Sequence, residues 1–347
     1  MLLALLGTAG LLAGALLLAS WWHRGQAARA VVAEQIAARM LASWAARDPE
    51  PAELTRLARL TAVERRAFLG FCARTLPPLE EGSVERARDA LHRTGLLQRE
   101  VTRLHHRSAW HRAEACRILG RLGRTGAVSP LVERLGDHDA TVRREAIGAL
   151  ADLRAVDAIG AIAAAIEARG GWNDLLAVMA LVRMGPGAVS RIGALLESSG
   201  SPAMTKALLQ VTGRLGAAAD PALVRILAAH ADPEIRIEAL RALGFLAGEE
   251  DSVAVCLAAM DGPEWPARAL AARSLGRLGD ARAVPRLERA MGDTAYWVRH
   301  HVAEALAGLG QPGEAALRRG LVDENPFVRD MAAQALYMQA VTRGESA

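Results

Sequence analysis

The sequence predicts an all-α protein, an α-solenoid of about seven to eight helix pairs preceded by a helical cap and one transmembrane helix. Three observations lead to this fold class. The 347 residues are 52% hydrophobic but only 4% aromatic, which argues against a sandwich or barrel rich in Val, Thr and Tyr. A pattern of about 31 residues recurs through the second part of the chain. The first 22 residues carry no charged side chain.

Residues 1–22 are predicted to form the transmembrane helix, because about 20 apolar residues suffice to cross a ~30 Å hydrocarbon core. Trp21 and Trp22 then stand where an interfacial aromatic belt belongs. A cleaved signal peptide is the alternative, since Ala28-Arg29-Ala30 has the small-x-small pattern of a cleavage site. The apolar run is longer than the apolar region of a typical signal peptide, and no basic side chain precedes it, so the spanning helix is favoured.

Charge asymmetry around this segment predicts its orientation. Arg24, Arg29 and Arg39 follow the apolar run, whereas no basic side chain precedes it. We therefore expect a single-pass protein of the inner (cytoplasmic) membrane, held through residues 2–22, with its C-terminal domain in the cytoplasm. Gly10 and Gly14 form a GxxxG pair that would let two such helices approach, which suggests a homodimer.

Between this segment and the repeats, the sequence predicts two helical regions. Residues 23–50 read as a juxtamembrane amphipathic helix that ends at Asp48-Pro49-Glu50-Pro51, and residues 51–107 as a cap of two or three helices with a capping box from Thr61 to Glu64. The apolar stripe of the amphipathic helix contains Val31, Ile36, Met40, Leu41 and Trp44.

The repeat occupies residues 108–347. Helical stretches such as "WHRAEACRILGRLG" from Trp110, "TVRREAIGALADLR" from Thr141 and "WVRHHVAEALAGLG" from Trp297 are copies of one pattern, each following a shorter apolar helix and an acidic turn. One arginine recurs in six copies, and two degenerate copies place Asp174 and Thr205 there, so that the spacing is 30 to 32 residues throughout. The arginines are Arg112, Arg143, Arg236, Arg268, Arg299 and Arg329. A helix pair that is apolar on more than one side must stack on its neighbours, which predicts a solenoid.

This period and the motif of a turn Asp followed by Val-Arg-x-x-Ala-x-x-Ala-Leu-Gly resemble HEAT repeats, in particular the short-period kind of phycobilisome lyases, over about 240 of the 347 residues. The resemblance implies a ladder in which the turn aspartates and the six arginines are hydrogen-bonded along the stack. Asp137, Asp293 and Asp323 each precede their arginine by six residues, and Asp261 precedes its own by seven. The copies at Asp174 and Thr205 lack the arginine, so the ladder is not expected there.

No catalytic motif is present in the sequence: it has no GxSxG, Walker loop or HExxH pattern, so no catalytic residue, cofactor or metal is predicted. Histidines cluster at His105, His106 and His111 and again at His300 and His301, but no Cys or carboxylate completes a ligand set at the expected spacing. Cys116 aligns with Ile147, Ala272 and Ala303 of other repeats, which predicts a core residue and not a nucleophile.

One periodic feature suggests a binding surface. Five and nine residues after the ladder arginine, several repeats carry arginine again, and such helices line the concave face of HEAT-like stacks. A merely solvated face is the alternative. The predicted partner-binding residues are Arg117, Arg121, Arg214, Arg241, Phe245, Arg273, Arg277, His300 and His301.

These features favour a membrane-tethered protein-binding scaffold or adaptor without catalysis, so the chain is not expected to be an enzyme. Acidic residues among the arginines, such as Glu114, Glu145 and Glu238, favour a protein partner, of unknown identity, over a nucleic acid. Two alternatives stay open: an accessory subunit of a membrane assembly, such as envelope glycan synthesis or signalling, and a lyase-like enzyme related to bilin lyases. For the last, the sequence offers no recognisable bilin-handling residues.

Overall fold

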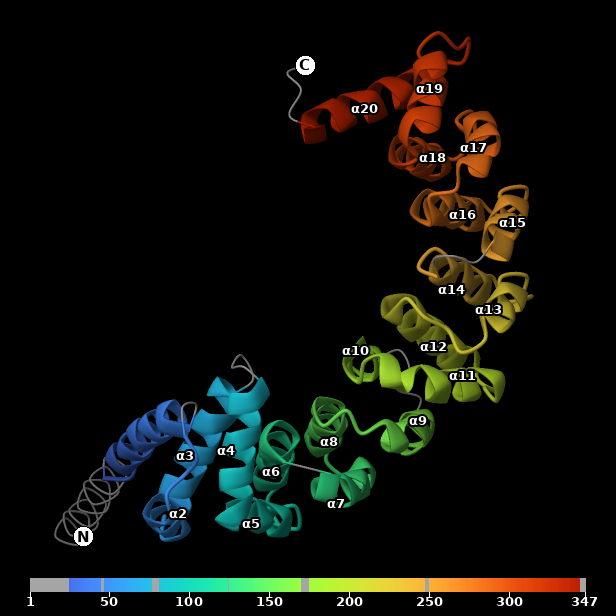
Figure 1. Ribbon diagram of the computed structural model, residues 1–347. Helices are drawn as coiled ribbons and strands as arrows, with labels where there is room; N and C mark the ends of the chain where they lie inside the picture. The colour runs from blue at the N-terminus through green and yellow to red at the C-terminus, as the bar shows by residue number, and fades with distance from the viewer. Residues whose placement is uncertain are drawn as a thin grey trace, which may run out of the picture. The chain divides into compact units, whose positions relative to one another are not determined.

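The computed structural model describes residues 25–44, 47–76, 81–123, 125–169, 175–246 and 250–343. These residues are helical or lie in turns, and no strand occurs among them, which confirms the predicted all-α class. The chain divides into two compact units, Met1–Ala158 and Ile159–Ala347 (Figure 1).

The first unit begins with a helix over residues 25–44, followed by α2 (Pro51–Ala58), α3 (Ala62–Thr75), α4 (Glu81–Arg93) and α5 (Leu96–Arg103). The predicted capping box starts α3: the Thr61 backbone N–H donates to Glu64 Oε2 at 2.9 Å, and the Glu64 N–H donates back to Thr61 Oγ1 at 3.4 Å. The helix over 25–44 buries Ala33, Ala37, Met40, Leu41 and Trp44. The placement of Val31 in this stripe was wrong, because its side chain is 54% exposed while the smaller Ala33 and Ala37 make the contact.

The remainder of the first unit is built from repeat helices. It comprises α6 (Ala109–Leu122), η1 (Thr125–Ala127), α7 (Val128–Glu133), η2 (Arg134–Gly136), α8 (Ala140–Asp152) and η3 (Val156–Ala158). Helices α5, α6 and α8 pack in sequence, and α3 also packs on α6. Asp139 begins α8 by accepting the backbone N–H groups of Thr141 and Val142, as an N-cap aspartate does.

The second unit continues the same arrangement. Its helices are α9 (Ile159–Glu167), α10 (Leu175–Arg183), η5 (Pro186–Ala188), α11 (Val189–Glu197), α12 (Pro202–Leu215), α13 (Pro221–Leu227), α14 (Pro233–Leu243), α15 (Glu250–Ala259), α16 (Trp265–Leu278), η6 (Ala281–Ala283), α17 (Val284–Ala290), α18 (Tyr296–Gly308), α19 (Gly310–Gly320) and α20 (Pro326–Arg343). Helices α12, α14, α16 and α18 form one layer, and α13, α15 and α17 form a second layer beside it (Figure 1).

Close approach within the first of these layers depends on glycine. A Cβ atom on Gly276 of α16 would lie 2.7 Å from the Cα of Ala305 on α18, a distance that Cβ atoms do not tolerate. Gly276 is therefore a packing residue, because the backbones of α16 and α18 meet there.

The ladder arginines share one geometry. In each of the six, Nη1 donates to the carbonyl oxygens of the residues six and five positions earlier, at 2.6 to 3.1 Å, so that the side chain closes the turn before its own helix. Arg112 and Arg268 also bind a carboxylate 25 residues later, on Asp137 and Asp293, through two hydrogen bonds each. These pairs join consecutive repeats.

The side chains of Asp261 and Asp323 do not pair with the ladder arginines as the resemblance to HEAT repeats implies. Arg236 pairs with Glu264, and Asp261 pairs instead with Arg286. Asp261 lies 25 residues after Arg236, the same interval as in the Arg112–Asp137 and Arg268–Asp293 pairs, but Glu264, three residues further on, binds this arginine in its place. Asp323 uses its Oδ1 to accept the backbone N–H of Asn325 at 2.8 Å.

The described residues contain no single helix that is both long and apolar enough to cross a bilayer. The predicted transmembrane segment, residues 2–22 with Gly10 and Gly14, lies outside the described residues, as do Trp21, Trp22 and Arg24. The degenerate repeat position Asp174 also lies outside them.

Candidate functional site

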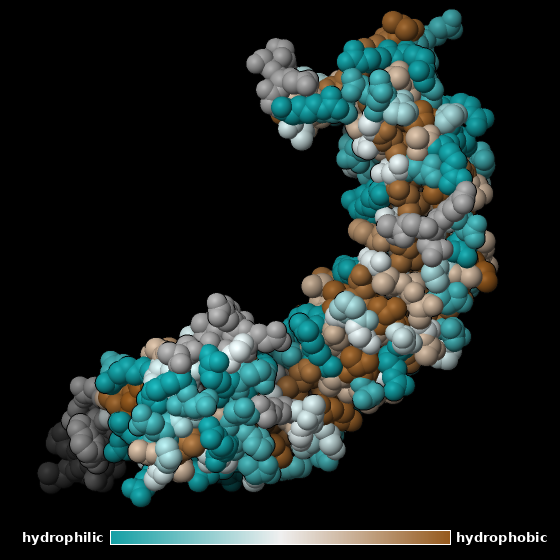
Figure 2. Space-filling model, viewed as in Figure 1, coloured by the Kyte–Doolittle hydropathy of each residue, from teal (hydrophilic) through white to brown (hydrophobic). Residues whose placement is uncertain are grey.

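Four of the predicted partner-binding arginines come together on neighbouring helices of the second unit. Arg214 lies on α12, Arg241 on α14, and Arg273 and Arg277 on α16, and these helices pack side by side. We call these four residues the arginine row. In Figure 2 the second unit shows more apolar surface than the first, which is mainly hydrophilic in that view.

The arginine row is only partly neutralised by the acids around it. Arg241 pairs with Glu238 at 2.6 Å, and Arg214 Nη1 donates to the neutral amide oxygen of Gln210 at 3.5 Å. Arg277 stacks over the ring of Phe245, with its Cζ 4.2 Å from the ring centroid. Burial, and then the positive charges of Arg273 and Arg241, lower the pKa of Arg277. An excess of positive charge therefore lies around an exposed aromatic ring.

The two predicted arginines of the first unit have different surroundings. Arg117 Nη2 is 2.7 Å from the carboxylate of Glu114 one helical turn earlier. Arg121 Nη1 donates to the backbone carbonyl of Ala73 at 3.1 Å and so ties α6 to α3. The structure thus gives Arg121 a contact within the fold, one that repeat alignment does not reveal because Ala73 belongs to the cap.

Cavities accompany this layer of helices in the second unit. One of about 250 Å³ is lined by Gly213, Arg214, Glu238, Arg241 and Phe245, among others. A second of about 470 Å³ lies between α18 and α20 and is lined by His300, Glu304 and side chains of α20 that include Met331, Gln334 and Met338. We call it the α18–α20 cavity. Gln339 and Thr342 also line it, so the cavity combines alanine and methionine side chains with several polar groups, as small-molecule sites do.

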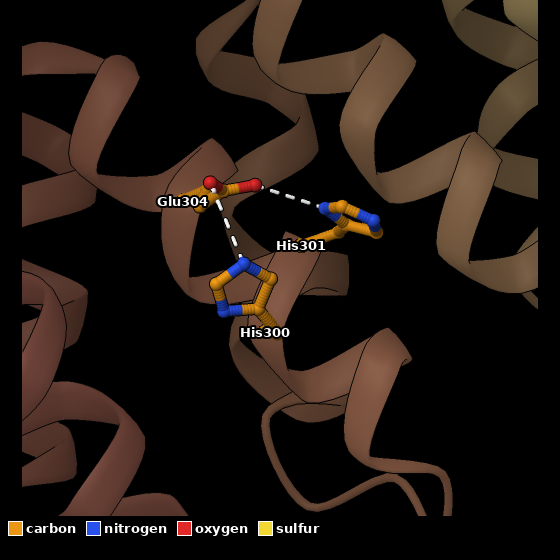
Figure 3. A group of neighbouring side chains, drawn as sticks. All are labelled: His300, His301 and Glu304. Carbon is orange, nitrogen blue, oxygen red and sulfur yellow. Dashed lines mark hydrogen bonds and ion pairs between the residues drawn. The ribbon is translucent and has the colours of Figure 1, made fainter.

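His300 and His301 meet a carboxylate beside this cavity, whose lining includes His300 and Glu304. His301 Nδ1 is 2.9 Å from Glu304 Oε2, and His300 Nε2 is 3.5 Å from Glu304 Oε1 (Figure 3). The three ligand-type atoms all lie within 4.8 Å of one another. We call these residues the histidine cluster. The sequence-based statement that no carboxylate completes a ligand set was wrong, because Glu304 follows His300 by four residues and lies on the same helical face.

Rings and charges around the histidine cluster hold it in place. The Tyr296 ring is stacked on His300 at a centroid distance of 5.9 Å, and the Trp297 ring lies 5.7 Å from His300 and 6.3 Å from His301. Burial by itself raises the pKa of Glu304, but the His301 hydrogen bond and the nearby charges, including Arg273, lower it overall. Glu304 is therefore an anionic acceptor at neutral pH.

The other histidine group does not form such an arrangement. The rings of His106 and His111 are 4.2 Å apart, but within the described parts of the chain the only group of His, Cys and acidic side chains with metal-ligand proximity is the histidine cluster.

The cysteines are unreactive core residues. Cys72, Cys116 and Cys256 are all buried free thiols, and burial raises the pKa of Cys116 and of Cys256 to about 12. A thiol with such a pKa is protonated at neutral pH and is a poor nucleophile. This agrees with the prediction that Cys116 is a core residue.

The chain resembles known HEAT-repeat proteins in sequence and in structure. The family model for HEAT repeats matches residues 100–181 and 221–307. The chain is 29% identical over 171 residues to the phycocyanobilin lyase subunit alpha of Picosynechococcus sp., an alignment that covers 48% of this chain and 56% of that protein. The chain thus spans little more than half the length of the curated relative that it matches.

Among solved structures, the chain is similar to Kap95p in a complex with RanGDP, with a TM-score of 0.51 and 12% identity over 92% of this chain and 52% of that one. It also matches the complex of CpcE and CpcF of phycocyanin lyase from Nostoc sp., with a TM-score of 0.33 and 20% identity over 71% of this chain and 94% of that one. The likeness to Kap95p shows a shared fold.

The similarity to a lyase subunit corrects two sequence-based interpretations. The hypothesis of a protein-binding scaffold or adaptor without catalysis was wrong, and so was the prediction that the chain is not an enzyme, because the relative at 29% identity is a phycocyanobilin lyase subunit. The sequence motifs gave no sign of this similarity, because none of the familiar catalytic patterns occurs in the chain. The family-model match and the helix pairs together show that this chain contains HEAT repeats and has a HEAT-repeat solenoid-like fold.

Proposed function

We propose that this chain is a lyase-like enzyme subunit that holds an open-chain tetrapyrrole, or a ligand of similar shape and charge, on the second unit. The observation that carries this proposal is the 29% identity over 171 residues to a phycocyanobilin lyase subunit alpha. The proposed site consists of the arginine row, Phe245 and the cavity of about 250 Å³ beside them.

Charge complementarity supports this choice of ligand. Phycocyanobilin carries two propionate side chains, and arginine binds carboxylates through paired, charge-assisted hydrogen bonds. Arg273 and Arg277 lie on one helix four residues apart, next to Arg241 of the neighbouring helix, whose charge contributes to lowering the pKa of Arg277. An anionic ligand would relieve this repulsion.

The apolar surface nearby suits the conjugated part of such a ligand. Phe245 is 41% exposed beside Arg277, so a flat π-system can stack on the ring. The cavity of about 250 Å³ brings Phe245 together with Arg214 and Arg241, which places an apolar wall and two cationic groups in one hollow.

We further propose that the chain works with a second protein subunit, as the designation "subunit alpha" of its relative suggests. Large aromatic side chains are exposed at the first turns of successive repeat helices: Trp265 on α16, Tyr296 and Trp297 on α18, and Phe327 on α20. Aromatic residues of this kind are enriched at protein interfaces, where they bury much area at low entropic cost.

Titration of the purified protein with phycocyanobilin, followed by the visible absorbance of the ligand, tests the proposed site. We expect saturable binding that the triple variant Arg214→Gln, Arg273→Gln and Arg277→Gln weakens at least about tenfold, since a lost charge-assisted hydrogen bond costs roughly 1.5 to 3 kcal/mol. The matched control is Arg56→Gln, Arg59→Gln and Arg93→Gln, which removes the same charge from exposed positions of the first unit.

Arg65 belongs to the same region of the first unit but is not substituted in the control, because it lies 3.8 Å from the carboxylate of the fully buried Glu100. Equal affinity of both triple variants, or no binding by the unsubstituted protein, would remove the arginine row from the proposal.

A further inference from the structure

We propose that His300, His301 and Glu304 bind a divalent transition-metal ion of the zinc class beside the α18–α20 cavity. None of its three ligands belongs to the arginine row, and the proposal does not depend on the proposed lyase-like function. It rests on the positions of the three side chains and on the way in which this repeat departs from the others.

The donor set has the composition that such ions prefer. Two imidazole nitrogens and one carboxylate oxygen are borderline ligands suited to Zn²⁺ and its neighbours in the transition series. In a tetrahedral zinc site, ligand atoms about 2.0 to 2.1 Å from the metal are about 3.3 Å from one another. Here His301 Nδ1 is 2.9 Å from Glu304 Oε2, His300 Nε2 is 3.5 Å from Glu304 Oε1, and the three ligand-type atoms lie within 4.8 Å of one another, so side-chain rotations that bring them closer together would receive an ion.

An ordinary structural ion pair does not explain all three residues. In α6 and α14 the positions two and five residues after the ladder arginine hold a glutamate and an arginine, which pair as Glu114 with Arg117 and as Glu238 with Arg241. In α18 the same two positions hold His301 and Glu304 in reversed order of charge. An ion pair at these positions of α18 needs only His301 and Glu304.

His300 is the third member and has no counterpart in that pairing. The position directly after the ladder arginine holds Ala113 in α6, Ile237 in α14 and Ala269 in α16, and it is charged in α8 and α20, which carry Arg144 and Asp330 there. A histidine at this position, together with the charge reversal at the two others, occurs only in α18 among these six helices. It brings a second imidazole nitrogen to the same carboxylate (Figure 3).

The surroundings favour a site with free coordination positions. His300 and Glu304 both line the α18–α20 cavity of about 470 Å³, so an ion held by them borders a space large enough for a small molecule. Catalytic zinc sites combine three protein ligands with an open position in this way, whereas structural sites are closed by four. The stacked Tyr296 ring limits the rotation of His300 and so orients this ligand before an ion binds.

The test uses the full-length protein after treatment with a chelator, with Co²⁺ as a spectroscopic probe and Zn²⁺ as competitor. We expect one equivalent of Co²⁺ to give visible d–d absorption that Zn²⁺ abolishes. Ni²⁺ or Cu²⁺ should also quench the fluorescence of Trp297, whose ring is 5.7 Å from His300, and Trp297→Phe should remove that part of the quenching.

Substitution of each proposed ligand tests whether the metal ion binds at the histidine cluster. His300→Asn, His301→Asn and Glu304→Gln should each weaken Zn²⁺ binding at least about tenfold in calorimetric titration, because even partners of metal ligands contribute 10- to 100-fold. His105→Asn and Glu197→Gln, which alter one exposed histidine and one exposed glutamate away from the histidine cluster, should leave it unchanged. Circular dichroism of the metal-free variants shows whether they are folded.

Absence of the Co²⁺ spectrum in the unsubstituted protein, or a spectrum that the three ligand variants retain, would overturn the metal site and leave His301 and Glu304 as the ion pair of their repeat. Because this readout involves no tetrapyrrole, its failure is distinct from a failure of the proposed function.

Discussion

The guanidinium of Arg112 binds both carboxylate oxygens of Asp137, 25 residues later, with Nε–Oδ2 and Nη2–Oδ1 distances of 2.8 Å each. Both side chains are buried, and Arg112 also donates to two carbonyl oxygens of its own turn. One side chain therefore stabilises its own repeat and connects it to the next.

Replacement of this arginine should be costly. We expect Arg112→Ala to lower the free energy of unfolding by about 3 to 5 kcal/mol, because the buried Asp137 carboxylate loses its two hydrogen bonds from a cation and keeps, as an arginine ion pair, only that with Arg134 at 3.9 Å. Arg143→Ala, which removes hydrogen bonds to the carbonyl oxygens of Asp137 and His138, should cost about 1 to 3 kcal/mol. Urea denaturation followed by circular dichroism gives both values. Equal losses would mean that the Asp137 carboxylate adds nothing to the ladder.

The same pair predicts a dependence of stability on pH. Burial by itself raises the pKa of Asp137, but the hydrogen bonds from Arg112 and from the Asp139 backbone outweigh it, so the pKa lies below its usual range. A carboxyl whose pKa is lower in the folded state stabilises the fold above its unfolded pKa of about 3.9, and this stabilisation is lost as the pH falls through the folded value.

Asp137→Asn should therefore be less stable than the unsubstituted protein at pH 7 and lose less stability between pH 5 and pH 3. Parallel denaturation curves across this range show the difference. An unchanged pH slope in Asp137→Asn would assign the acid sensitivity to other carboxyls.

Gly276 offers a test of the packing between α16 and α18. We expect Gly276→Ala to destabilise the protein by about 1 to 3 kcal/mol, because the added Cβ would lie 2.7 Å from the Ala305 backbone. Gly160→Ala is the matched control on α9, where no atom outside its own helix lies within 4 Å of the added Cβ. That substitution should be neutral or slightly stabilising. The difference in melting temperature between the two variants shows whether the close approach of α16 and α18 requires glycine at position 276.

The buried thiols predict slow chemical modification. Because Cys72, Cys116 and Cys256 are buried and the pKa of Cys116 and Cys256 is raised to about 12, a thiol reagent at pH 8 should react with the folded protein far more slowly than with the protein in guanidinium chloride. A tetrapyrrole bound to this chain should accordingly be released by denaturation. Ligand that stays attached on a denaturing gel would show that one of these thiols becomes accessible.

The membrane prediction for residues 2–22 depends on sequence alone and has a direct test. A reporter that is active only in the cytoplasm, fused after Ala347, should be active because Arg24, Arg29 and Arg39 follow the apolar run. Activity of a periplasm-only reporter at that position would contradict the predicted orientation. A mature protein that begins at Val31 would instead indicate a cleaved signal peptide.

The repeat and its arginines could be predicted from the sequence because they depend on local interactions. Arg143 closes a turn made by Asp137 and His138, only six and five residues away, and this short-range contact recurs with every copy of the motif. The periodic apolar positions specify helix pairs in the same way, since each pair can bury its apolar surface only against its neighbours. Sequence therefore determined the helical class and the repeat.

The tertiary structure decided which polar side chains meet. Arg121 aligns with the arginine row but contacts Ala73, 48 residues earlier, and Arg65 approaches Glu100 of α5. Glu304 was visible in the sequence, yet only the side-chain rotamers on α18 show that it reaches both His300 and His301. Periodicity specifies the face on which a residue lies, whereas contacts between helices and the directions of long side chains depend on how the whole stack packs.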